Sequence, residues 1–553
     1  MAAKIGRISG APLRALAASM RTPVRQAAAA LVRPQLGITE VLALPQSMRG
    51  EMPIDQRPLR ARESHAREDL GLEIPETRDF QHGLGALRRA YEGGLSPTRV
   101  VEHALDQADK LARRRPSLGP LQEQDREAAL RAAGESEARM RDGTARPLEG
   151  VVTVIKEEVD LRGLHTQLGT DFWTDAPASE DGTSVARLRQ AGAIVLGNSM
   201  MTQFGMSPLG VNPHRRMPRN AHSPGHLPGG SSTGSAVAVA TGVVPMALGF
   251  DGGGSIRIPA CLNGVYGLKP TLGRVPVSGH GAPSGSTVVH AGPIAAGCHE
   301  LAAFLDATAG ADGHDPIATG QPEPTQGAFV AALGRGVRGL RIGVPESEWA
   351  DAPQAITDPA REALRSLTAD GAEIVPVELP LAPHASAIGY LTIGLENAAF
   401  LQNHFGARIH VLEPYLQIFV GQFSAFGSFD YIDAQRLRAG LRRQAAEVLR
   451  EVDLIALPTT GATAPPVTDA EAAGGFVDPP ALHAISRFSY LGNLTGLPGG
   501  TAPVGMVDGL PVGLQLIADA WDEATILQTL AHLQRTGAAE AVRPESHVAL
   551  PYA

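Results

Sequence analysis

The sequence contains Pro228-Gly-Gly-Ser-Ser-Thr-Gly-Ser-Ala236 and, shortly after it, Asp251-Gly-Gly-Gly-Ser-Ile-Arg257. Each segment carries a glycine-flanked serine, and these two, Ser231 and Ser255, lie 24 residues apart. An isolated glycine-serine segment is usually a loop, but two in tandem around an apolar run of small residues are hard to interpret as linkers. Because glycine has no Cβ, the Gly-Gly-Gly-Ser run lets several backbone N–H groups approach one developing oxyanion. The pair predicts a hydrolytic active site that includes Ser255.

Lysine is rare in this chain. Of 48 cationic side chains only four are lysine, and one of them, Lys156, ends the β-branched run Val151-Val-Thr-Val-Ile155. A buried ammonium loses hydration and its pKa falls, whereas a guanidinium stays protonated, so only a lysine can become a base there. The alternative is an inert strand-end charge that is paired with Glu157 or Glu158. The serine segments downstream favour the base.

The composition excludes several classes of protein. The chain has 553 residues, is 43% hydrophobic and 19% charged, and carries a formal charge of −9. It has no basic stripe with interleaved aromatics, so we expect no nucleic-acid binding, and no apolar run long enough for a transmembrane helix. Cys261 and Cys298 cannot form a disulfide framework and stand in no zinc-ligand spacing. We expect a cytoplasmic protein that holds no metal and no cofactor.

The N-terminal region differs from the rest in charge. Residues 1–39 contain six basic side chains and no acidic one before Glu40, which indicates a disordered basic arm, with an organelle-targeting segment as the alternative. We divide the chain into an N-terminal extension over 1–75, partly disordered or wrapped on the surface, a helical part over 76–145 and a catalytic core over 146–550.

Helical and strand patterns alternate along the core. Apolar residues recur at three- and four-residue intervals between 84 and 108, and Ser96-Pro97 is a helix start signal within that range. Residues 183–190 have a helical pattern and are followed by a strand pattern over 191–196, and a later helix over 431–451 precedes a strand over 453–457. Such alternation predicts an α/β fold, in which helices cover both faces of a sheet.

Residues 80–545 resemble the amidase signature family of serine hydrolases. The matching segments are 147–157 (PLEGVVTVIKE), 219–220 (RN), 228–236 (PGGSSTGSA), 251–260 (DGGGSIRIPA), 264–271 (GVYGLKPT), 453–459 (DLIALPT), 493–498 (NLTGLP) and 509–515 (GLPVGLQ). The spacings of 75 residues from Lys156 to Ser231 and 24 from Ser231 to Ser255 agree with the family's catalytic spacing. The resemblance implies an α/β/α sandwich, in which a large twisted mixed sheet is covered by helices on both faces.

The resemblance also implies a Ser–cis-Ser–Lys triad. Ser255 would be the nucleophile, Ser231 the proton bridge and Lys156 the base. The reaction would hydrolyse the C–N bond of a carboxylic acid amide through an acyl-enzyme. The family's oxyanion donors correspond to the backbone N–H groups of these residues: Gly252, Gly253, Gly254 and Ser255.

Other residues of the motif have supporting roles in this interpretation. Asp251 and Arg257 flank the nucleophile loop and are expected to fix its backbone, and Ser232 is expected to be structural. Gly205 lines up with a family position whose backbone contacts substrate. The sequence departs from the family pattern at these positions: Phe250 replaces threonine, Thr233 replaces glycine, Glu157 replaces aspartate, and Met200 and Gln203 replace the more frequent asparagine and glutamate.

Two other functions stay open. Gly230-Ser-Ser-Thr-Gly234 fits the nucleophile elbow of an α/β-hydrolase esterase, in which Ser232 would attack. Residues 220–228, however, are a poor strand because they contain two prolines and a glycine. The second alternative is a glutamine amidotransferase subunit that works with partners on aminoacyl-tRNA, although the arginine-tyrosine-aspartate-glycine signature of that branch is missing.

The expected partner is a small-molecule amide, and a homodimer is possible. Variable segments such as 385–430 form the pocket walls in the family, and this segment contains five phenylalanines: Phe400, Phe405, Phe419, Phe423 and Phe426. We therefore expect an apolar or aromatic acyl group on the substrate.

Overall fold

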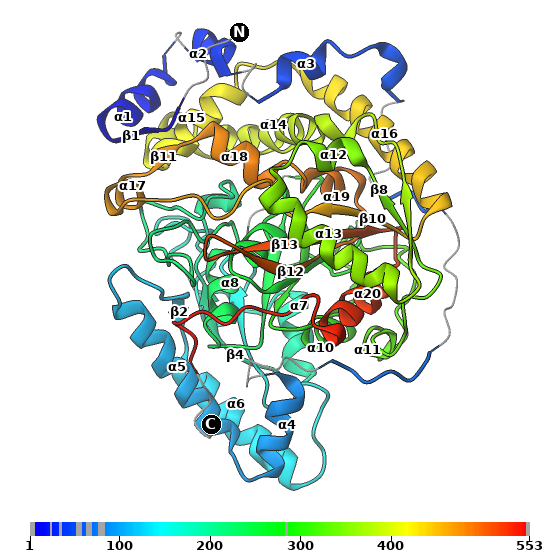
Figure 1. The fold of residues 1–553 in the computed structure, drawn as a ribbon. Coiled ribbons are helices and arrows are strands. Elements are labelled where there is room, and N and C mark those ends of the chain that lie inside the picture. Colours follow the sequence, from blue (N-terminus) through cyan, green and yellow to red (C-terminus); the bar gives the residue numbers. More distant parts are fainter. Residues whose placement is uncertain are drawn as a thin grey trace.

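A large mixed sheet runs through the centre of the molecule (Figure 1). The computed structural model describes residues 6–22, 25–32, 36–50, 58–61, 69–75, 83–281 and 286–548. In that part of the chain the sheet has 11 strands, in the order β2 (Leu121–Gln124), β4 (Ile194–Ser199), β3 (Val152–Lys156), β5 (Met246–Asp251), β7 (His290–Ala295), β6 (Tyr266–Lys269), β12 (Gly499–Val507), β13 (Leu510–Ala518), β10 (Leu454–Pro458), β8 (Arg341–Val344) and β9 (Glu373–Pro376). The sheet confirms the α/β class.

The strand that ends in Lys156, β3, and the strand that precedes the Ser255 loop, β5, are parallel neighbours. β3 lies between β4 and β5 and pairs with both in parallel. β8 pairs in parallel with β9 and β10, and the other pairs in the sheet are antiparallel. Parallel neighbours end at the same edge of a sheet, and in open α/β sheets that edge is where ligands bind. Residues that follow β3 and β5 therefore lie close together.

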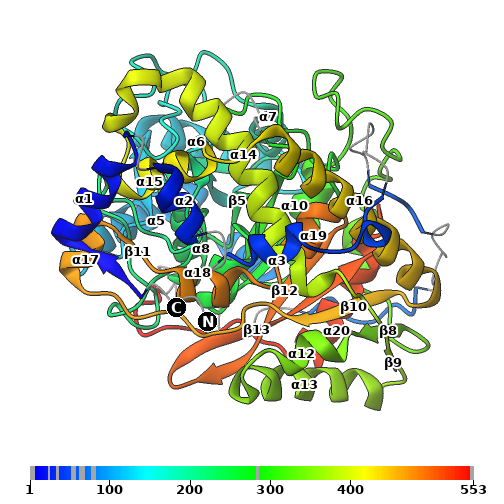
Figure 2. The same cartoon turned by 90° about the horizontal axis from the view of Figure 1, so that it is seen from above.

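Helices cover both faces of the sheet (Figures 1 and 2). The helices of the core are α4 (Leu84–Glu92), α5 (Pro97–Arg113), α6 (Arg126–Arg141), α7 (Thr183–Gln190), α8 (Thr233–Ala240), α9 (Arg257–Leu262), α10 (Cys298–Thr308), α11 (Ala328–Ala332), α12 (Glu346–Ala350), α13 (Gln354–Ala369), α14 (Ala385–Phe405), α15 (Pro414–Phe423), α16 (Ser428–Glu451), α17 (Asp469–Gly474), α18 (Pro479–Ser486), α19 (Tyr490–Thr495) and α20 (Glu523–Thr536). None of the helices in the described residues is both long and apolar enough to cross a membrane.

Strand β10 shows that the sheet separates two apolar cores. Its Leu454 and Ala456 belong to the core that includes α10, α13 and α20, and its Ile455 and Leu457 belong to the core that includes α14, α15 and α16. Side chains alternate between the faces of a strand, so the two cores lie on opposite faces. This arrangement confirms the predicted α/β/α sandwich.

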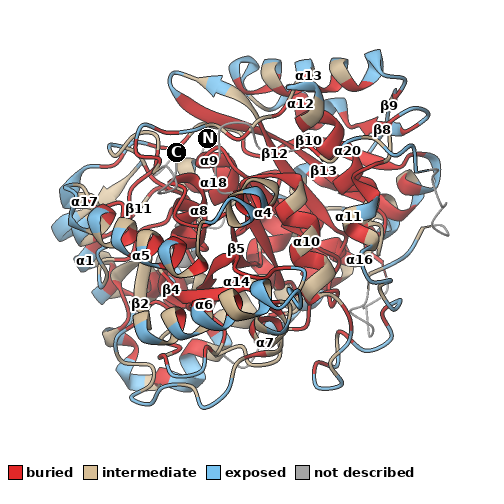
Figure 3. Ribbon diagram, turned by 90° about the horizontal axis from the view of Figure 1, so that it is seen from below, coloured by how far each residue is buried: buried red, intermediate tan, exposed pale blue. Residues whose placement is uncertain are grey.

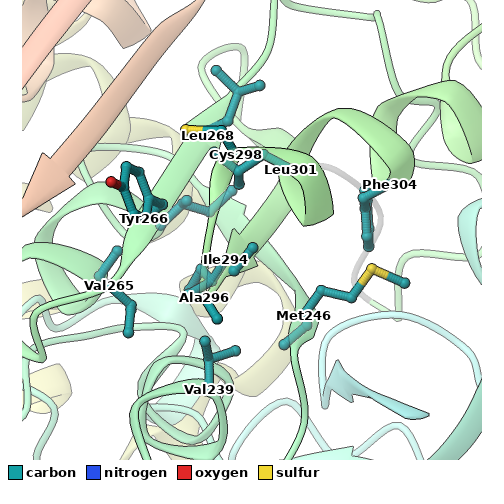
Figure 4. Packing of buried hydrophobic residues seen from close by; sticks show 14 of the residues in the cluster. Val239, Met246, Val265, Tyr266, Leu268, Ile294, Ala296, Cys298, Leu301 and Phe304 are labelled. Carbon is teal, nitrogen blue, oxygen red and sulfur yellow. The ribbon is translucent and has the colours of Figure 1, made fainter. Parts of the chain in front are cut away.

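Close packing makes the sheet a rigid platform. Val239 of α8, Met246 of β5, Ile294 of β7 and Phe304 of α10 are fully buried and lie together in one cluster (Figure 4). Figure 3 shows buried residues through the middle of the sheet and exposed residues on the outer faces of the helices. Interiors packed in this way deform little, so the ends of β3 and β5 have a fixed relative position.

Several element boundaries agree with the sequence pattern. α5 begins at Pro97, and the Ser96 side chain accepts a hydrogen bond from the backbone N–H of Arg99, so Ser96 is the N-cap. α16 ends at Glu451, as predicted, but begins three residues earlier than predicted, at Ser428.

The described part of the N-terminal extension lies on the core. Its elements are β1 (Ile8–Ser9), α1 (Gly10–Ser19), α2 (Arg25–Val32) and α3 (Ile38–Leu42), and β1 pairs with β11 (Phe476–Val477). Arg7 forms ion pairs with Glu471 and Asp478, and Leu13 is fully buried. Residues 6–22 are therefore wrapped on the surface rather than forming a free basic arm.

Candidate active site

Lys156, Ser231 and Ser255 line the same cavity. Lys156 is the last residue of β3, Ser231 lies in the loop before α8, and Ser255 lies between β5 and α9. Lys156 Nζ lies 2.8 Å from Ser231 Oγ, within hydrogen-bond distance. The Ser232 backbone N–H donates to the Ser255 carbonyl at 3.2 Å, which holds the two serine loops against each other.

The three side chains differ in exposure. Lys156 and Ser231 are each 1% exposed, whereas Ser255 is 9% exposed. The peptide bond between Gly230 and Ser231 is cis, the geometry that the family resemblance implies. Ser255 is therefore the member of the group that is most open to a molecule in the cavity.

Burial determines the protonation chemistry of Lys156. Burial lowers the pKa of its ammonium, and the nearby carboxylates of Glu158 and Asp251 oppose that shift. Lys156 is thus a buried group and not a surface charge. Its neighbour Glu157 has a different partner, because its carboxylate accepts a hydrogen bond from Arg215 at 3.2 Å. Burial raises the pKa of Glu157 to about 7 although Arg215 acts in the opposite direction.

Glu158 and His280 are functional candidates that sequence reasoning missed. Glu158 Oε2 lies 2.5 Å from Lys156 Nζ, and Glu158 Oε1 lies 3.1 Å from His280 Nε2. Both residues line the cavity. The sequence suggests Glu158 only as the partner of an inert lysine, and no local signal marks His280, because an isolated bridge between Val159 and His280 brings the two segments together.

Asp251 organises the nucleophile loop through its carboxylate. Oδ1 accepts a hydrogen bond from the Gly254 N–H at 2.6 Å, and Oδ2 accepts one from the Ile256 N–H at 3.1 Å. Arg257 donates to both oxygens at 3.0 Å, and both side chains are fully buried. Burial alone would raise the pKa of Asp251, but Arg257, Lys269 and Asn493 together outweigh it and hold the pKa far below its ordinary value. This geometry supports the backbone-fixing role expected for the pair.

The backbone N–H of Gly254 is not available as an oxyanion donor, contrary to our prediction. Its N–H is already donated to Asp251, so it cannot also bind an oxyanion. Its φ of 115° and a Cβ position only 2.5 Å from Ile258 Cδ1 explain why glycine occurs there. Gly252 and Ser255 line the cavity, as does Gly205, whose φ is 70°.

Ser232 does not face the cavity. It is fully buried, and its hydroxyl donates to the Phe250 carbonyl at 3.1 Å and accepts from the Phe250 N–H at 3.2 Å. The segment before it, 220–230, contains no strand, apart from an isolated bridge at His226. Ser232 therefore anchors the serine loop to β5, which is the structural role that we expected.

The cavity is small and mostly apolar. Its volume is about 60 Å³. Its apolar lining consists of Leu168, Phe204, Met206, Phe250, Val277, Val289, Ile317, Ile393 and Phe400. Of the five phenylalanines that we expected in the pocket wall, only Phe400 lines it. Phe405, Phe419 and Phe423 are buried in the core that includes α14 and α15, and Phe426 packs against that core.

The described residues contain no group of three or more histidine, cysteine, aspartate or glutamate side chains that could hold a metal ion. Cys261 and Cys298 are free and buried.

Comparisons with known proteins identify the family of the chain. A family model described as Amidase matches residues 99–527. The chain is 36% identical over 435 residues to a glutamyl-tRNA(Gln) amidotransferase subunit of Roseiflexus castenholzii, and the match covers 74% of this chain and 87% of the relative. It is 32% identical over 462 residues to a fatty acid amide hydrolase of Medicago truncatula, covering 82% of this chain and 76% of the relative.

Solved structures show the same fold. A peptide amidase from Stenotrophomonas maltophilia superimposes with a TM-score of 0.69 at 29% identity, covering 84% of this chain and 98% of that one. A bacterial aryl acylamidase of the amidase signature family superimposes with a TM-score of 0.71 at 26% identity, covering 80% and 94%. The chain described here therefore belongs to the amidase signature family.

Proposed function

We propose that this protein is an amidase that hydrolyses a linear carboxylic acid amide to an acid and an amine or ammonia. Ser255 is the nucleophile, Ser231 the proton bridge and Lys156 the base. The observation that carries the proposal is the 2.8 Å separation of Lys156 Nζ and Ser231 Oγ at a cavity that Ser255 also lines. A lysine becomes a base only where it can be neutral at working pH, and burial of Lys156 acts in that direction.

The proton steps follow from this order of groups. Neutral Lys156 takes the proton of Ser231 while Ser231 takes the proton of Ser255, and Ser255 Oγ forms a bond to the amide carbon. When the tetrahedral intermediate collapses, the C–N bond breaks and the proton returns through Ser231 to the leaving nitrogen. An amine leaves poorly unless it is protonated, so this return is essential for an amide. Water then attacks the acyl-enzyme by the same relay and releases the acid.

Backbone N–H groups stabilise the oxyanion in this proposal. Gly252, Gly253 and Ser255 are the donors, and Gly254 is left out because Asp251 binds its N–H. Asp251 and Arg257 act through the loop backbone, which they hold in place before the substrate binds. Preorganised donors of this kind are usually the largest single contribution to such catalysis.

An esterase that uses Ser232 finds no support in the geometry. Its hydroxyl is bonded to Phe250, away from the cavity, and the nucleophile elbow of an α/β-hydrolase needs a strand before the serine. A substrate must reach the attacking oxygen, and Ser255 is the more exposed serine.

A subunit of an amidotransferase is the second candidate function. It is favoured by the 36% identity to a glutamyl-tRNA(Gln) amidotransferase subunit. The two functions differ in their need for partners. We expect the purified chain alone to hydrolyse a simple aryl amide, measured by release of the arylamine. Activity that requires both glutamine and added partner subunits would instead show the amidotransferase.

The substrate that fits the site has a small apolar acyl group. The lining is apolar apart from a few polar groups beside Lys156 and at Ser286 and Asn397. The cavity volume of about 60 Å³ is well below the roughly 300 to 1,000 Å³ of sites for drug-sized ligands. A series of anilides of increasing acyl length tests this: kcat/KM should fall once the acyl chain exceeds a few carbons, and a steady rise with length would contradict it.

A further inference from the structure

Lys156 shares a carboxylate with a histidine. Glu158 lies between the two, with Oε2 2.5 Å from Lys156 Nζ and Oε1 3.1 Å from His280 Nε2. The Glu158 and His280 side chains are each 9% exposed and the Lys156 side chain is 1% exposed. One buried negative charge is therefore placed between two groups that can each carry a positive charge.

Glu158 keeps its negative charge. Burial alone would raise the pKa of its carboxyl, but Lys156 and His280 outweigh burial and lower the pKa to about 2. A buried carboxylate is costly unless a cation or a hydrogen-bond donor compensates it. When Lys156 compensates it, Lys156 is an ammonium and cannot accept the proton of Ser231. When the Nε2–H group of His280 donates a hydrogen bond to it, Lys156 is free to be neutral.

The other charged groups near Lys156 have partners of their own. Asp251 acts on Lys156 more weakly than Glu158, and Arg257 donates two hydrogen bonds to its carboxylate. The Glu157 carboxylate is bonded to Arg215 and is not among the groups that shift the pKa of Lys156. Glu158 and His280 are thus the pair that faces the lysine within the cavity.

Packing holds the histidine in this position. The His280 ring meets the Phe250 ring edge to face, with centroids 5.1 Å apart, and Lys156 Nζ lies 5.9 Å from the Phe250 centroid. Phe250 is the residue that replaces the family's threonine before the nucleophile loop. Its ring lies beside both side chains, so this departure from the family pattern belongs to the same cluster.

We propose that Glu158 and His280 are positioning residues that set the proton affinity of Lys156, and thereby the pH range in which the triad is active. The proposal rests on the proposed function, in which Lys156 is the base. Glu158 raises the proton affinity of Lys156, and His280 lowers it by drawing the carboxylate toward itself. Neither residue belongs to the triad, and both act through Lys156.

The test measures, as a function of pH, how fast a fluorophosphonate probe labels Ser255. The experiment can be done without knowing the substrate, and the labelling rate should rise as Lys156 loses its proton. In Glu158→Gln the acid limb of the profile should move to lower pH by about 1 to 3 units, the usual effect of one close charge. In His280→Leu the limb should move to higher pH, since Glu158 then has only Lys156 as its partner. An acid limb that stays in place in both variants would overturn the proposal.

Two controls separate this inference from the proposed function. Glu157→Gln removes the neighbouring buried carboxylate that contacts Arg215, and its acid limb should coincide with that of the wild type. If Glu158→Gln does not fold, the upward shift in His280→Leu decides the question alone. If the wild-type chain is labelled at Ser255 and Lys156→Ala slows labelling while the Glu158 and His280 variants keep the wild-type limb, the inference fails and the triad stands. If Lys156→Ala labels as fast as the wild type, the triad itself fails.

Discussion

Arg257 is a fully buried guanidinium, and its charge is compensated by Asp251. The same carboxylate binds the Gly254 and Ile256 N–H groups, so one side chain serves both the charge balance and the loop. Further acceptors for Arg257 come from the Ser489 carbonyl at 2.9 Å and Asn493 Oδ1 at 2.6 Å. The nucleophile loop is therefore held by a polar network inside the protein and not by its contact with substrate.

Replacing Asp251 by asparagine should strongly destabilise the fold. The change leaves Arg257 buried without its counter-charge, and breaking a buried pair in this way costs about 3 to 5 kcal/mol. Chemical denaturation of the two proteins measures the free energy of unfolding. The matched control is Glu362→Gln, which breaks the exposed pair with Arg365 and should cost less than about 1 kcal/mol. If both variants lose the same free energy of unfolding, the Asp251 network stabilises the fold no more than an exposed ion pair does.

Residue chemistry predicted part of the site and missed another part. The β-branched run before Lys156 and the spacing of Ser231 and Ser255 were visible in the sequence, because they depend on local pattern. His280 was not visible, because its place beside Glu158 depends on an isolated bridge between distant segments. The hydrogen bond that occupies the Gly254 N–H also depends on three-dimensional geometry.

At the scale of elements, α1 packs against α15. Its Leu13 and Ala17 form a small core with Ile418 of α15, and β1 adds a short strand beside β11. The basic residues of this region suggested a free arm, since no acid occurs nearby in the sequence. The acids that pair with Arg7 are Glu471 and Asp478, more than 460 residues away. Local composition could not reveal them.

Leu13→Ala should loosen α1 from α15 without affecting the sheet. The leucine is fully buried, and removing a buried leucine side chain deletes apolar contacts and leaves a cavity. Hydrogen exchange, followed by mass spectrometry, should show faster exchange over 10–19 and unchanged exchange over β3 and β5. Leu16→Ala, at a partly buried position of the same helix, is the control with a smaller expected effect. Unchanged exchange over α1 in Leu13→Ala would mean that this helix is held by other contacts.

For the whole molecule, the α/β class and the helices on both faces of the sheet followed from alternating patterns, and the mixed sheet followed from the family resemblance, but the strand order followed from neither. β12 and β13 insert between β6 and β10, and β10 is followed by β8, an arrangement that no local pattern encodes. The same long-range packing buries charged groups whose protonation makes stability depend on pH. Glu413 is an example, because burial raises its pKa to about 8.

Glu413 should make the protein less stable as the pH rises. The pKa of its carboxyl is higher in the folded chain than in the unfolded chain, so the folded state binds more protons from this group between about pH 4.5 and 8. Protonated Glu413 contributes fully to stability at a pH below its pKa in the unfolded chain. That contribution is lost as the pH rises through its pKa in the folded chain. Denaturation at pH 5 and pH 8 should show a smaller difference in Glu413→Gln than in the wild type. An equal difference in both proteins would contradict this assignment.

The most direct test of the triad is to identify the labelled serine and measure its dependence on Lys156. A sulfonyl fluoride probe, followed by peptide mapping, should label Ser255 in the wild-type chain. Lys156→Ala should slow that labelling by roughly 10² to 10⁴-fold, the usual range for loss of a general base, with an unchanged circular dichroism spectrum. Labelling at Ser232, or an undiminished rate in Lys156→Ala, would contradict the account.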